Sequence, residues 1–232
     1  MSSASQDIQC VGFIMDGNRR WAKAHGKHTL EGHRKGAETF TDIARAIRDL
    51  HIPHAVFYAF STENWNRSPE EVAYLMDLFH EFLDEAEKKL KDDNEKKVHI
   101  RVIGRTEDFS DDLQKRIEKL RERDAEVEAD TTIWVALSYG GRAELVTAVN
   151  RAIAAGEPVT EETFASQLWT ADMPDADIII RTSGEQRLSN FITWKSVYSE
   201  LFFTDTLWPA FTREELATIL DAYQLRHRRG GT

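Results

Sequence analysis

Residues 11–21 read VGFIMDGNRRW, and this stretch decides the fold of the chain. Its first five residues form an apolar run bounded by turn residues, which predicts a buried strand over residues 11–15. Gly17 and Asn18 predict the turn that ends this strand, with Asn18 as the N-cap of a helix that begins near Arg19. A strand, a turn and a helix in succession are the unit from which parallel α/β sheets are built.

Asp16 stands in this turn beside Arg19 and Arg20. Guanidinium groups and the backbone N–H groups of a helix start bind phosphate oxygens, and a carboxylate binds Mg²⁺. The three residues therefore suit a Mg²⁺-bound diphosphate. The alternative interpretation is that Asp16 only caps the helix and that both arginines are solvated.

Composition and charge narrow the class of protein. The 232 residues are 41% hydrophobic and 30% charged, so we expect one globular domain over residues 1–232, with a flexible N-terminus over residues 1–9. The apolar runs are too short to cross a bilayer and no secretory signal is evident, which predicts a cytoplasmic protein. The single Cys10 excludes an internal disulfide and a cysteine-pair zinc site. A formal net charge of −10 argues against nucleic-acid binding and against purely electrostatic membrane binding.

Short apolar runs alternate with long amphipathic stretches along the chain. The expected strands span residues 11–15, 55–60, 99–103, 132–137 and 177–180. The expected helices span residues 36–50, 69–91, 111–128, 142–155 and 213–226. This alternation predicts right-handed βαβ units, and hence an α/β fold with a central, mainly parallel sheet wrapped by helices.

Polar loops follow four of the expected strands, and they begin at Asp16, Ser61, Ser138 and Arg181. Because the carboxyl ends of parallel strands meet at one edge of the sheet, where open α/β folds bind ligands, we expect a site there. In the last loop Arg181 and Arg187 would clamp a second phosphate group, the alternative being an exposed polar loop.

Three further features allow two interpretations each. The apolar stripe of the helix over residues 69–91 is typical of a core-facing helix, but it also suits the wall of an apolar cavity. His33 is either a surface group or, if its helix faces the Asp16 loop, a donor to the diphosphate or a proton carrier. Glu200 is either the partner of an arginine or a second metal ligand that arrives from elsewhere in the fold.

Five motifs occur in the order found in the cis-prenyltransferases: Asp16 to Trp21, Gly32-His33, Tyr58 to Trp65, Tyr139 to Arg142, and Arg181 to Asn190. The chain resembles the bacterial undecaprenyl diphosphate synthases, also called isoprenyl transferases, from about Val11 to Gly231. The resemblance implies a single-domain α/β fold with a hydrophobic tunnel, and a homodimer. It implies a Mg²⁺-dependent enzyme that condenses isopentenyl diphosphate repeatedly with an allylic diphosphate, forming cis double bonds.

The same resemblance implies roles for individual residues. Asp16 would position Mg²⁺, Asn64 would be the proton acceptor, and Glu200 would be a second metal-linked group. The residues that would line the allylic site are Gly17, Asn18, Arg19, Arg20, Trp21 and His33. Those that would close over the reacting groups are Ser61, Thr62, Glu63, Trp65 and Arg67. Those that would hold isopentenyl diphosphate are Arg181, Arg187, Leu188 and Ser189.

Two positions depart from the family pattern. Thr29 stands where the family usually has arginine, so either one contact to the diphosphate is missing or a neighbour such as Lys27 or His28 replaces it. Ser138 stands where asparagine usually precedes the Tyr-Gly-Gly-Arg motif, which changes the local hydrogen bonding. For the tunnel, the expected wall consists of Leu75, Met76, Phe79 and Leu83, and the expected floor is Ile133 or Trp134.

Several alternatives stay open at this point. A short-chain cis-prenyl diphosphate synthase would stop after one or two additions. A non-catalytic accessory subunit of a prenyltransferase would be expected to lose the chemistry of Asp16, Asn64 and Arg181, all of which are present. A trans-type synthase would be all-helical with Asp-Asp-x-x-Asp repeats, whereas this chain has a strand pattern and lacks them. The starter, the product length and any transient membrane contact for product release are not determined by these residues.

Overall fold

The computed structural model describes residues 8–89, 98–126, 128–156 and 158–226. A six-stranded sheet lies at its centre in the order β3-β4-β2-β1-β5-β6, and every neighbouring pair is parallel. The strands are β1 (Cys10–Ile14), β2 (His54–Ser61), β3 (Val98–Ile103), β4 (Thr131–Tyr139), β5 (Ile178–Arg181) and β6 (Glu200–Phe203). The predicted single-domain α/β fold with a parallel sheet is confirmed.

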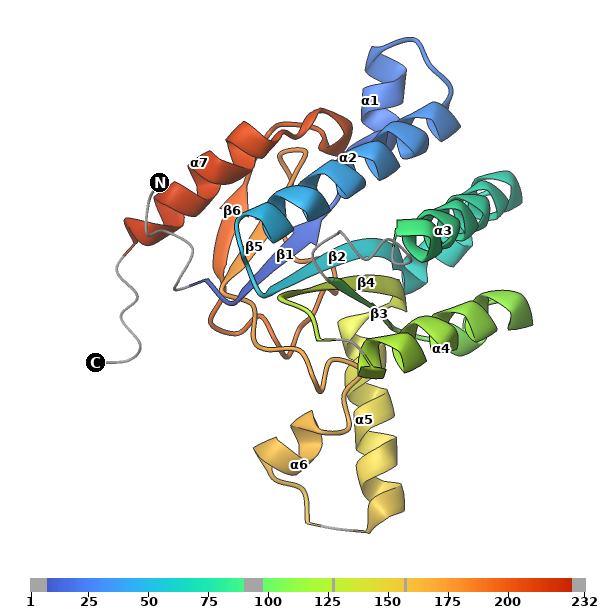
Figure 1. Ribbon diagram of the computed structural model, residues 1–232, viewed down its shortest axis with the longest axis vertical. Coiled ribbons are helices and arrows are strands. Elements are labelled where there is room, and N and C mark those ends of the chain that lie inside the picture. Colours follow the sequence, from blue (N-terminus) through green and yellow to red (C-terminus); the bar gives the residue numbers. More distant parts are fainter. Residues whose placement is uncertain (1–7, 90–97, 127, 157, 227–232) are drawn as a thin grey trace.

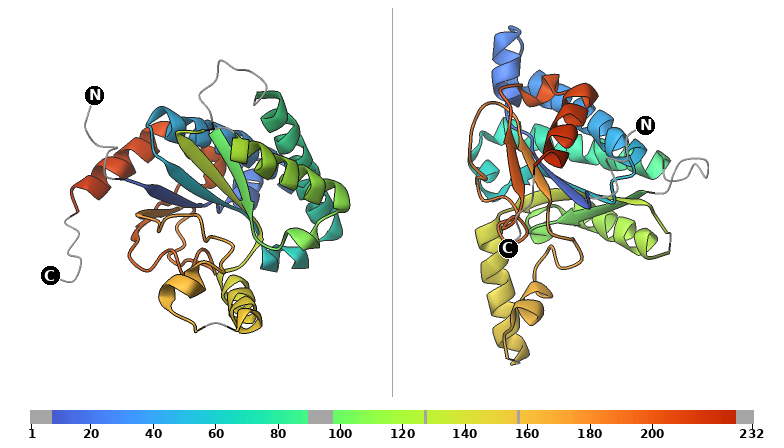
Figure 2. Two further views of the ribbon diagram at one scale, coloured as in Figure 1. Left: turned by 60° about the horizontal axis from the view of Figure 1, so that its bottom comes forward. Right: turned by 90° about the vertical axis from the view of Figure 1, so that its left-hand side faces the viewer.

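Helices lie on both sides of the sheet (Figure 1). One side carries the larger apolar core, built with α2 (Thr29–Asp49), α3 (Pro69–Lys89), α4 (Asp111–Glu126) and α7 (Arg213–Gln224). On the other side lie the segments before and after β5, residues 166–176 and 188–199, and two helices that extend away from the sheet, α5 (Gly141–Ala155) and α6 (Glu161–Ala165) (Figure 2). A short helix, α1 (Asn18–Ala24), projects beyond the end of α2. Single 3-10 turns are η2 (Thr62–Asn66), η3 (Thr106–Asp108) and η4 (Trp208–Ala210).

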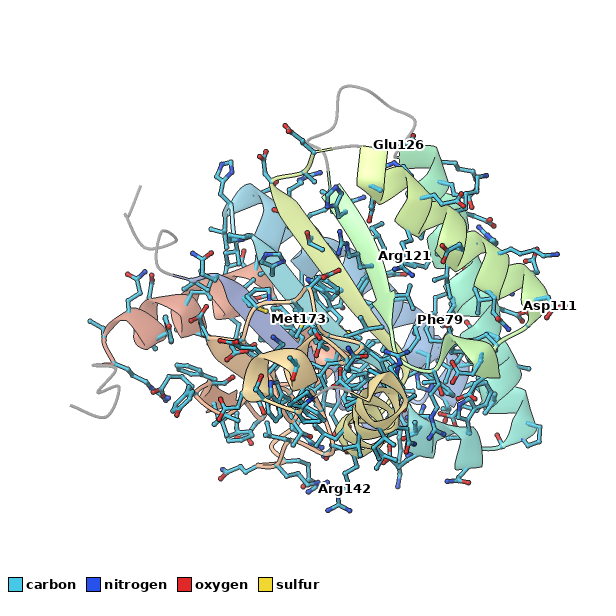
Figure 3. All side chains as sticks on the ribbon, turned by 90° about the horizontal axis from the view of Figure 1, so that it is seen from below. Phe79, Asp111, Arg121, Glu126, Arg142 and Met173 are labelled. Carbon is cyan, nitrogen blue, oxygen red and sulfur yellow. The ribbon has the colours of Figure 1, made fainter. Side chains whose placement is uncertain are left out.

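Successive side chains of a strand enter opposite cores, as β4 shows. Ile133 and Val135 belong to the core under α2 and α3, while Trp134 and Ala136 belong to the core on the other side. Every residue of β4 is buried, which is why the strand reads as a nearly continuous apolar run. Among the residues labelled in Figure 3, Phe79 of α3 packs against the first core and Met173 belongs to the core on the opposite face.

The junction of α1 and α2 corrects two expectations. Asn18 is not the N-cap of α1: Gly17 takes that place with φ 114°, and Asn18 is the first helical residue. The helix α2 begins at Thr29 rather than at residue 36. Gly32 and Gly36 lie inside α2 because α1 packs against them, and a Cβ at either glycine would overlap an oxygen of Asn18. These glycines permit a close helix contact and do not end a helix.

Other differences lie at the ends of elements. The short strand β6 and the five-residue helix α6 were not expected, and α4 ends two residues before residue 128. Of the expected flexible N-terminus, residues 1–7 lie outside the described residues, whereas Ile8 is buried and the Gln9 N–H donates to Asp177 Oδ2 at 2.7 Å. Residues 90–97 and the C-terminal residues 227–232 also lie outside the described part of the chain. Among the helices that the structure describes, none is long and apolar enough to cross a membrane.

Candidate active site

The loops after β1, β2, β4 and β5 meet at one edge of the sheet, as predicted from their sequence positions. Asn190 connects three of them: its Nδ2 donates to Glu63 at 3.0 Å, and its Oδ1 accepts from the Arg142 backbone N–H at 2.8 Å. Tyr58 of β2 donates to the carbonyl oxygens of Tyr139 and Ser189 at 3.2 and 3.3 Å. Asn190 was not a predicted site residue, and its signal was its place at the end of the Arg181 loop motif.

Asp16 lies at the centre of a charged cluster. Its Oδ2 accepts a hydrogen bond from Arg181 Nη2 at 3.0 Å and is 3.3 Å from Arg20 Nη2. Its carbonyl oxygen accepts from Thr182 Oγ1 at 2.7 Å and from the Trp208 N–H at 3.0 Å, which fixes the loop. Partial burial alone would raise the pKa of Asp16, but the two guanidinium groups outweigh it and hold the pKa below its usual range. The carboxylate is therefore ionised at neutral pH.

Arg181 is the buried cation of the site, with a side chain only 4% exposed. Its Nη1 donates to Ser189 Oγ at 2.7 Å and to the Arg187 carbonyl at 2.6 Å. Its Nε is buried and has no hydrogen-bond partner among the described residues. A buried donor without an acceptor is costly, so this N–H is suited to an oxygen of an anionic ligand.

The loop that carries Arg187 has an unusual backbone. Positive φ angles occur at four of its non-glycine residues, namely Ser183, Ser189, Asn190 and Ile192. Non-glycine residues adopt such angles at a cost, and they do so most often where function requires a fixed geometry. One result is the position of Ser183, whose Oγ and carbonyl oxygen accept from Arg20 at 2.5 and 3.0 Å.

His33 forms a second polar cluster with two residues of the neighbouring segment. Its Nε2 lies 2.8 Å from Glu71 Oε1, and Arg67 Nη1 donates to the same oxygen at 2.9 Å. Burial lowers the pKa of His33, and the positive charges of Arg67 and Arg19 add to this against the opposing effect of Glu71. Glu71 was not predicted, because in the sequence it looks like an ordinary residue of a helix start.

The segment after β2 holds Asn64 and Trp65 in different environments. The Ser61 N–H donates to Asn64 Oδ1 at 3.1 Å, and Asn64 lines a cavity. The Trp65 indole N–H instead donates to Ser138 Oγ at 2.8 Å, and its ring packs between Phe60 and Phe109. Trp65 thus supports the segment from behind and is not among the residues that line the cavity.

The cavity has a volume of about 510 Å³ and lies between α2, α3 and the sheet. One end is polar and contains Asn18, His33, Asn64 and Arg67. The interior is apolar, with Met15, Phe40, Ala59, Leu75, Leu78, Phe79, Phe82, Val135 and Trp208 in its lining, whereas polar and charged side chains of α2 and α3 complete the lining. Since Met15 and Asn18 flank the Asp16 turn, the charged cluster adjoins the polar end. The cavity lies where the resemblance implied a hydrophobic tunnel, but its lining differs in part from the expected residues.

The expected wall and floor of the tunnel are partly wrong. On α3, Leu75 and Phe79 line the cavity, but Leu78 and Phe82 do so in place of Met76 and Leu83. On β4 the lining residue is Val135. Trp134 faces the opposite core, where its indole N–H donates to His54 at 3.2 Å, and Ile133 is in the same core as Val135 but outside the lining.

Comparison with known proteins identifies the family. A family model described as "Putative undecaprenyl diphosphate synthase" matches residues 14–231. The chain belongs to this prenyltransferase family. An isoprenyl transferase of Thermotoga maritima is 41% identical over 96% of each chain. A ditrans,polycis-undecaprenyl-diphosphate synthase ((2E,6E)-farnesyl-diphosphate specific) of Micrococcus luteus is also 41% identical, over 99% of this chain and 93% of that protein.

A solved structure agrees with this assignment. The lavandulyl diphosphate synthase of Lavandula x intermedia, solved in complex with dimethylallyl diphosphate, is similar over 100% of both chains, with a TM-score of 0.91 and 31% identity. The chain is thus an enzyme that transfers prenyl groups.

Glu200 of this prenyltransferase does not join Asp16. It begins β6 opposite Ile178, whereas Asp16 follows the other end of β1, beyond the pairing of Ile14 with Arg181. Glu200 Oε2 instead accepts from Arg226 Nη1 at 2.6 Å, which is the ion pair that the alternative interpretation described. Within one chain, the strand register places Glu200 at the end of the sheet opposite to Asp16. Its role as a metal-linked group stays a prediction.

The remaining predicted residues lie nearer the surface. Arg187 is exposed and paired with Glu185 at 2.5 Å, and Leu188 packs against the core opposite the cavity. Trp21 stacks on His25 with the ring centroids 4.2 Å apart. A wide basic depression is formed by Arg19, Arg20, Lys23, Lys27, His28 and Thr29.

The two residues that were expected to compensate for Thr29 have other partners. Lys27 forms an ion pair with Glu31 at 3.0 Å, and His28 Nδ1 accepts from the Leu30 N–H at the start of α2. Among the described residues, Asp16 therefore keeps Arg20 and Arg181 as its cationic neighbours.

The donor set at Asp16 fits a shared Mg²⁺ site. Within the described part of the chain there is no cluster of three or more histidine, cysteine or acidic side chains that could enclose a metal ion. Mg²⁺ is commonly held by one or two carboxylates together with substrate phosphates, and not by a complete protein cage. The partly exposed carboxylate of Asp16, among groups suited to phosphate oxygens, matches that mode of binding.

Proposed function

We propose that this prenyltransferase is an undecaprenyl-diphosphate-synthase-like enzyme that uses Mg²⁺ to condense isopentenyl diphosphate with an allylic diphosphate. The observation that carries the proposal is the continuity of an ionic site with an apolar cavity. A prenyl diphosphate has a charged head and an apolar tail. Asp16, Arg20 and Arg181 suit the head, and the adjoining cavity suits the tail.

In the first step the C–O bond of the allylic diphosphate breaks, so negative charge develops on the leaving diphosphate. Prearranged cations stabilise such a transition state. One unit charge about 4 Å from an opposite charge contributes about 4 kcal/mol at an effective dielectric constant near 20. Arg20 would supply such a contact, and Asp16 would hold Mg²⁺, which when bound neutralises further charge on the diphosphate.

In the second step a carbon–carbon bond forms to isopentenyl diphosphate and one proton is lost. The diphosphate of that substrate would be held by Arg181, whose Nε has no other partner among the described residues, and by Arg187 and Ser189. Asn64 is the proton-acceptor position that we propose, because its Oδ1 is fixed by the Ser61 N–H at the polar end of the cavity. The departing diphosphate offers an alternative acceptor for the same proton.

The apolar cavity supports repeated condensation. Each added unit brings five carbons, which is worth up to about 4 kcal/mol if each buried carbon contributes about 0.8 kcal/mol. The tail therefore holds the product on the enzyme between condensations. A polyprenyl diphosphate is the product we favour.

A second candidate is a short-chain cis-prenyl diphosphate synthase. The observation that favours it is the close structural similarity to lavandulyl diphosphate synthase, which was solved with dimethylallyl diphosphate. A non-catalytic accessory subunit is disfavoured, because Asp16 and Arg181 are in direct contact and Asn64 lines the adjoining cavity.

We also propose a cytoplasmic homodimer that contacts the membrane transiently to release its product. Support for a dimer comes from exposed apolar residues on α5, where Val146, Val149 and Ile153 are 61%, 45% and 72% exposed. Support for membrane contact comes from the apolar character of the proposed product.

The test is prenyl transfer with Mg²⁺, labelled isopentenyl diphosphate and geranyl, farnesyl or geranylgeranyl diphosphate, with products sized by chromatography. A ladder of long products that is absent in Asp16→Ala and in a chelator-treated sample would support the proposal. Products that stop after one or two additions would favour the short-chain enzyme. No incorporation with any starter would refute a stand-alone synthase.

A further inference from the structure

Arg34 of α2 and Glu81 of α3 form a two-point ion pair, which we call the Arg34–Glu81 clasp. Nη1 and Nη2 of Arg34 donate to the two carboxylate oxygens of Glu81, each at 3.0 Å. Arg34 Nε donates to Tyr74 Oη of α3 at 3.1 Å. Three donors of one guanidinium therefore connect the two helices with a defined geometry.

The clasp spans the outer side of the hydrophobic cavity. Arg34 and Glu81 are both lining residues, yet their side chains are 50% and 52% exposed. Each side chain therefore contacts both the cavity and the solvent. Beneath them the helices approach through apolar rings, with the centroids of Phe40 and Phe82 5.3 Å apart.

The spacing of the lining residues explains why the outer side of the cavity is polar and its interior is apolar. On α2 the lining includes Arg34, Glu38, Thr41 and Arg45, which follow one helical stripe and present polar side chains. On α3, Glu81 and Glu85 form the facing polar row, whereas Leu75, Phe79 and Phe82 lie deeper. The cavity thus has an apolar interior and a charged outer seam, and the clasp is an ion pair that crosses this seam from α2 to α3.

We propose that the Arg34–Glu81 clasp limits product length by holding α3 against α2 over the growing tail. This inference rests on the proposed function, since a tail that gains five carbons at each condensation outgrows a cavity of fixed size. A bidentate pair fixes the spacing of the helices, but an exposed pair is weak enough to be broken by a tail that needs more room. Chain growth would continue past the filled cavity only as often as the clasp opens.

A matched pair elsewhere on α2 provides the control. Arg213 of α7 contacts Asp42 of α2 with its Nε and Nη2 at 2.9 and 2.7 Å, again between exposed side chains of two helices. Neither residue lines the cavity. If any exposed interhelical ion pair of α2 affected product length through stability alone, both pairs would have the same effect.

The test compares product lengths for the wild type, Glu81→Gln, the exchanged double variant Arg34→Glu with Glu81→Arg, and Asp42→Asn. We expect Glu81→Gln to lengthen the predominant product by at least one isoprene unit, the exchange to restore the wild-type length, and Asp42→Asn to leave it unchanged. An unchanged product distribution in Glu81→Gln, or an equal change in Asp42→Asn, would refute the role of the clasp.

A binding measurement keeps this result separate from the proposed reaction. Saturated alkyl diphosphates of increasing length cannot react, and each further buried carbon should tighten binding by up to about fourfold until the cavity is full. In Glu81→Gln the affinity should keep increasing up to longer alkyl chains than in the wild type, even if no condensation is ever observed. The same limiting length in both proteins would overturn the inference, whatever the activity assay shows.

Discussion

His33 shows how a single residue connects the site to the pH dependence of stability. Burial is the main cause that lowers its pKa, so the folded protein keeps the imidazole neutral under conditions in which an unfolded histidine would bind a proton. A histidine whose pKa is lower in the folded than in the unfolded protein contributes to stability at pH values above its pKa in the unfolded chain, about 6.5. That contribution is lost as the pH falls from this value toward the pKa in the folded protein. The protein should therefore lose stability as the pH drops below about 6.5.

Replacing His33 tests this prediction. His33→Gln should flatten the dependence of the free energy of unfolding on pH in that window, as measured by denaturant titrations at several pH values. Glu71→Gln should steepen it, because Glu71 is the neighbour that favours the protonated imidazole. If the free energy of unfolding of His33→Gln depends on pH as steeply as that of the wild type, another group causes the loss of stability at acidic pH.

For individual residues, the sequence predicted those that follow the ends of strands. It missed those whose partners come from distant parts of the chain. Asp16 and Arg181 were predicted because each stands where a buried strand gives way to a polar turn, and Arg20 because it lies four residues after Asp16 at the start of the next helix. Glu71 was missed because its partner His33 is 38 positions away. The position of Glu200 at the start of β6 was not predicted, since residue type alone carries no information about strand register.

Among the elements, the contact of α1 with α2 depends on two glycines. At Gly32 an added Cβ would overlap the backbone oxygen of Asn18, which cannot move without shifting α1 and the Asp16 turn. At Gly36 it would overlap the side-chain oxygen of Asn18, which can rotate. The sequence expectation that α2 begins at residue 36 was wrong because this packing overrides the low helix propensity of glycine.

Gly32→Ala should therefore destabilise the protein by about 1–3 kcal/mol through overpacking, although alanine gains up to about 1 kcal/mol in helix propensity. It should also raise the KM for the allylic diphosphate, because α1 carries Arg20. Gly36→Ala is the matched control and should have a smaller effect on both. Thermal unfolding and steady-state kinetics measure the two effects, and a neutral or stabilising Gly32→Ala would contradict the packing argument.

For the whole molecule, the parallel order of the sheet explains why the fold was predictable and the tunnel was not. Buried parallel strands appear in the sequence as apolar runs, and the polar loops that bind ligands follow their carboxyl ends. The lining of the tunnel depends on which side of a strand or helix faces the other layer. Trp134 and Val135 are neighbours in sequence, yet they lie in opposite cores.

The exposed face of α5 provides a prediction about the assembly. Val146, Val149 and Ile153 follow each other at intervals of three and four residues, so they form one apolar stripe on the helix. Leaving such a stripe in water is unfavourable, and burying one aliphatic side chain contributes about 1.5–3 kcal/mol. In the proposed homodimer a second copy of the chain would cover this stripe.

Light scattering coupled to size-exclusion chromatography should thus report a dimer for the wild type. Val149→Lys should weaken the dimer at least about tenfold, since about 1.4 kcal/mol corresponds to that factor and a buried lysine adds a desolvation cost. Leu225→Lys is the control, because Leu225 is 82% exposed at the end of α7, apart from this stripe in sequence. A wild-type monomer would refute the dimer, and a dimer that Val149→Lys leaves intact would place its interface away from α5.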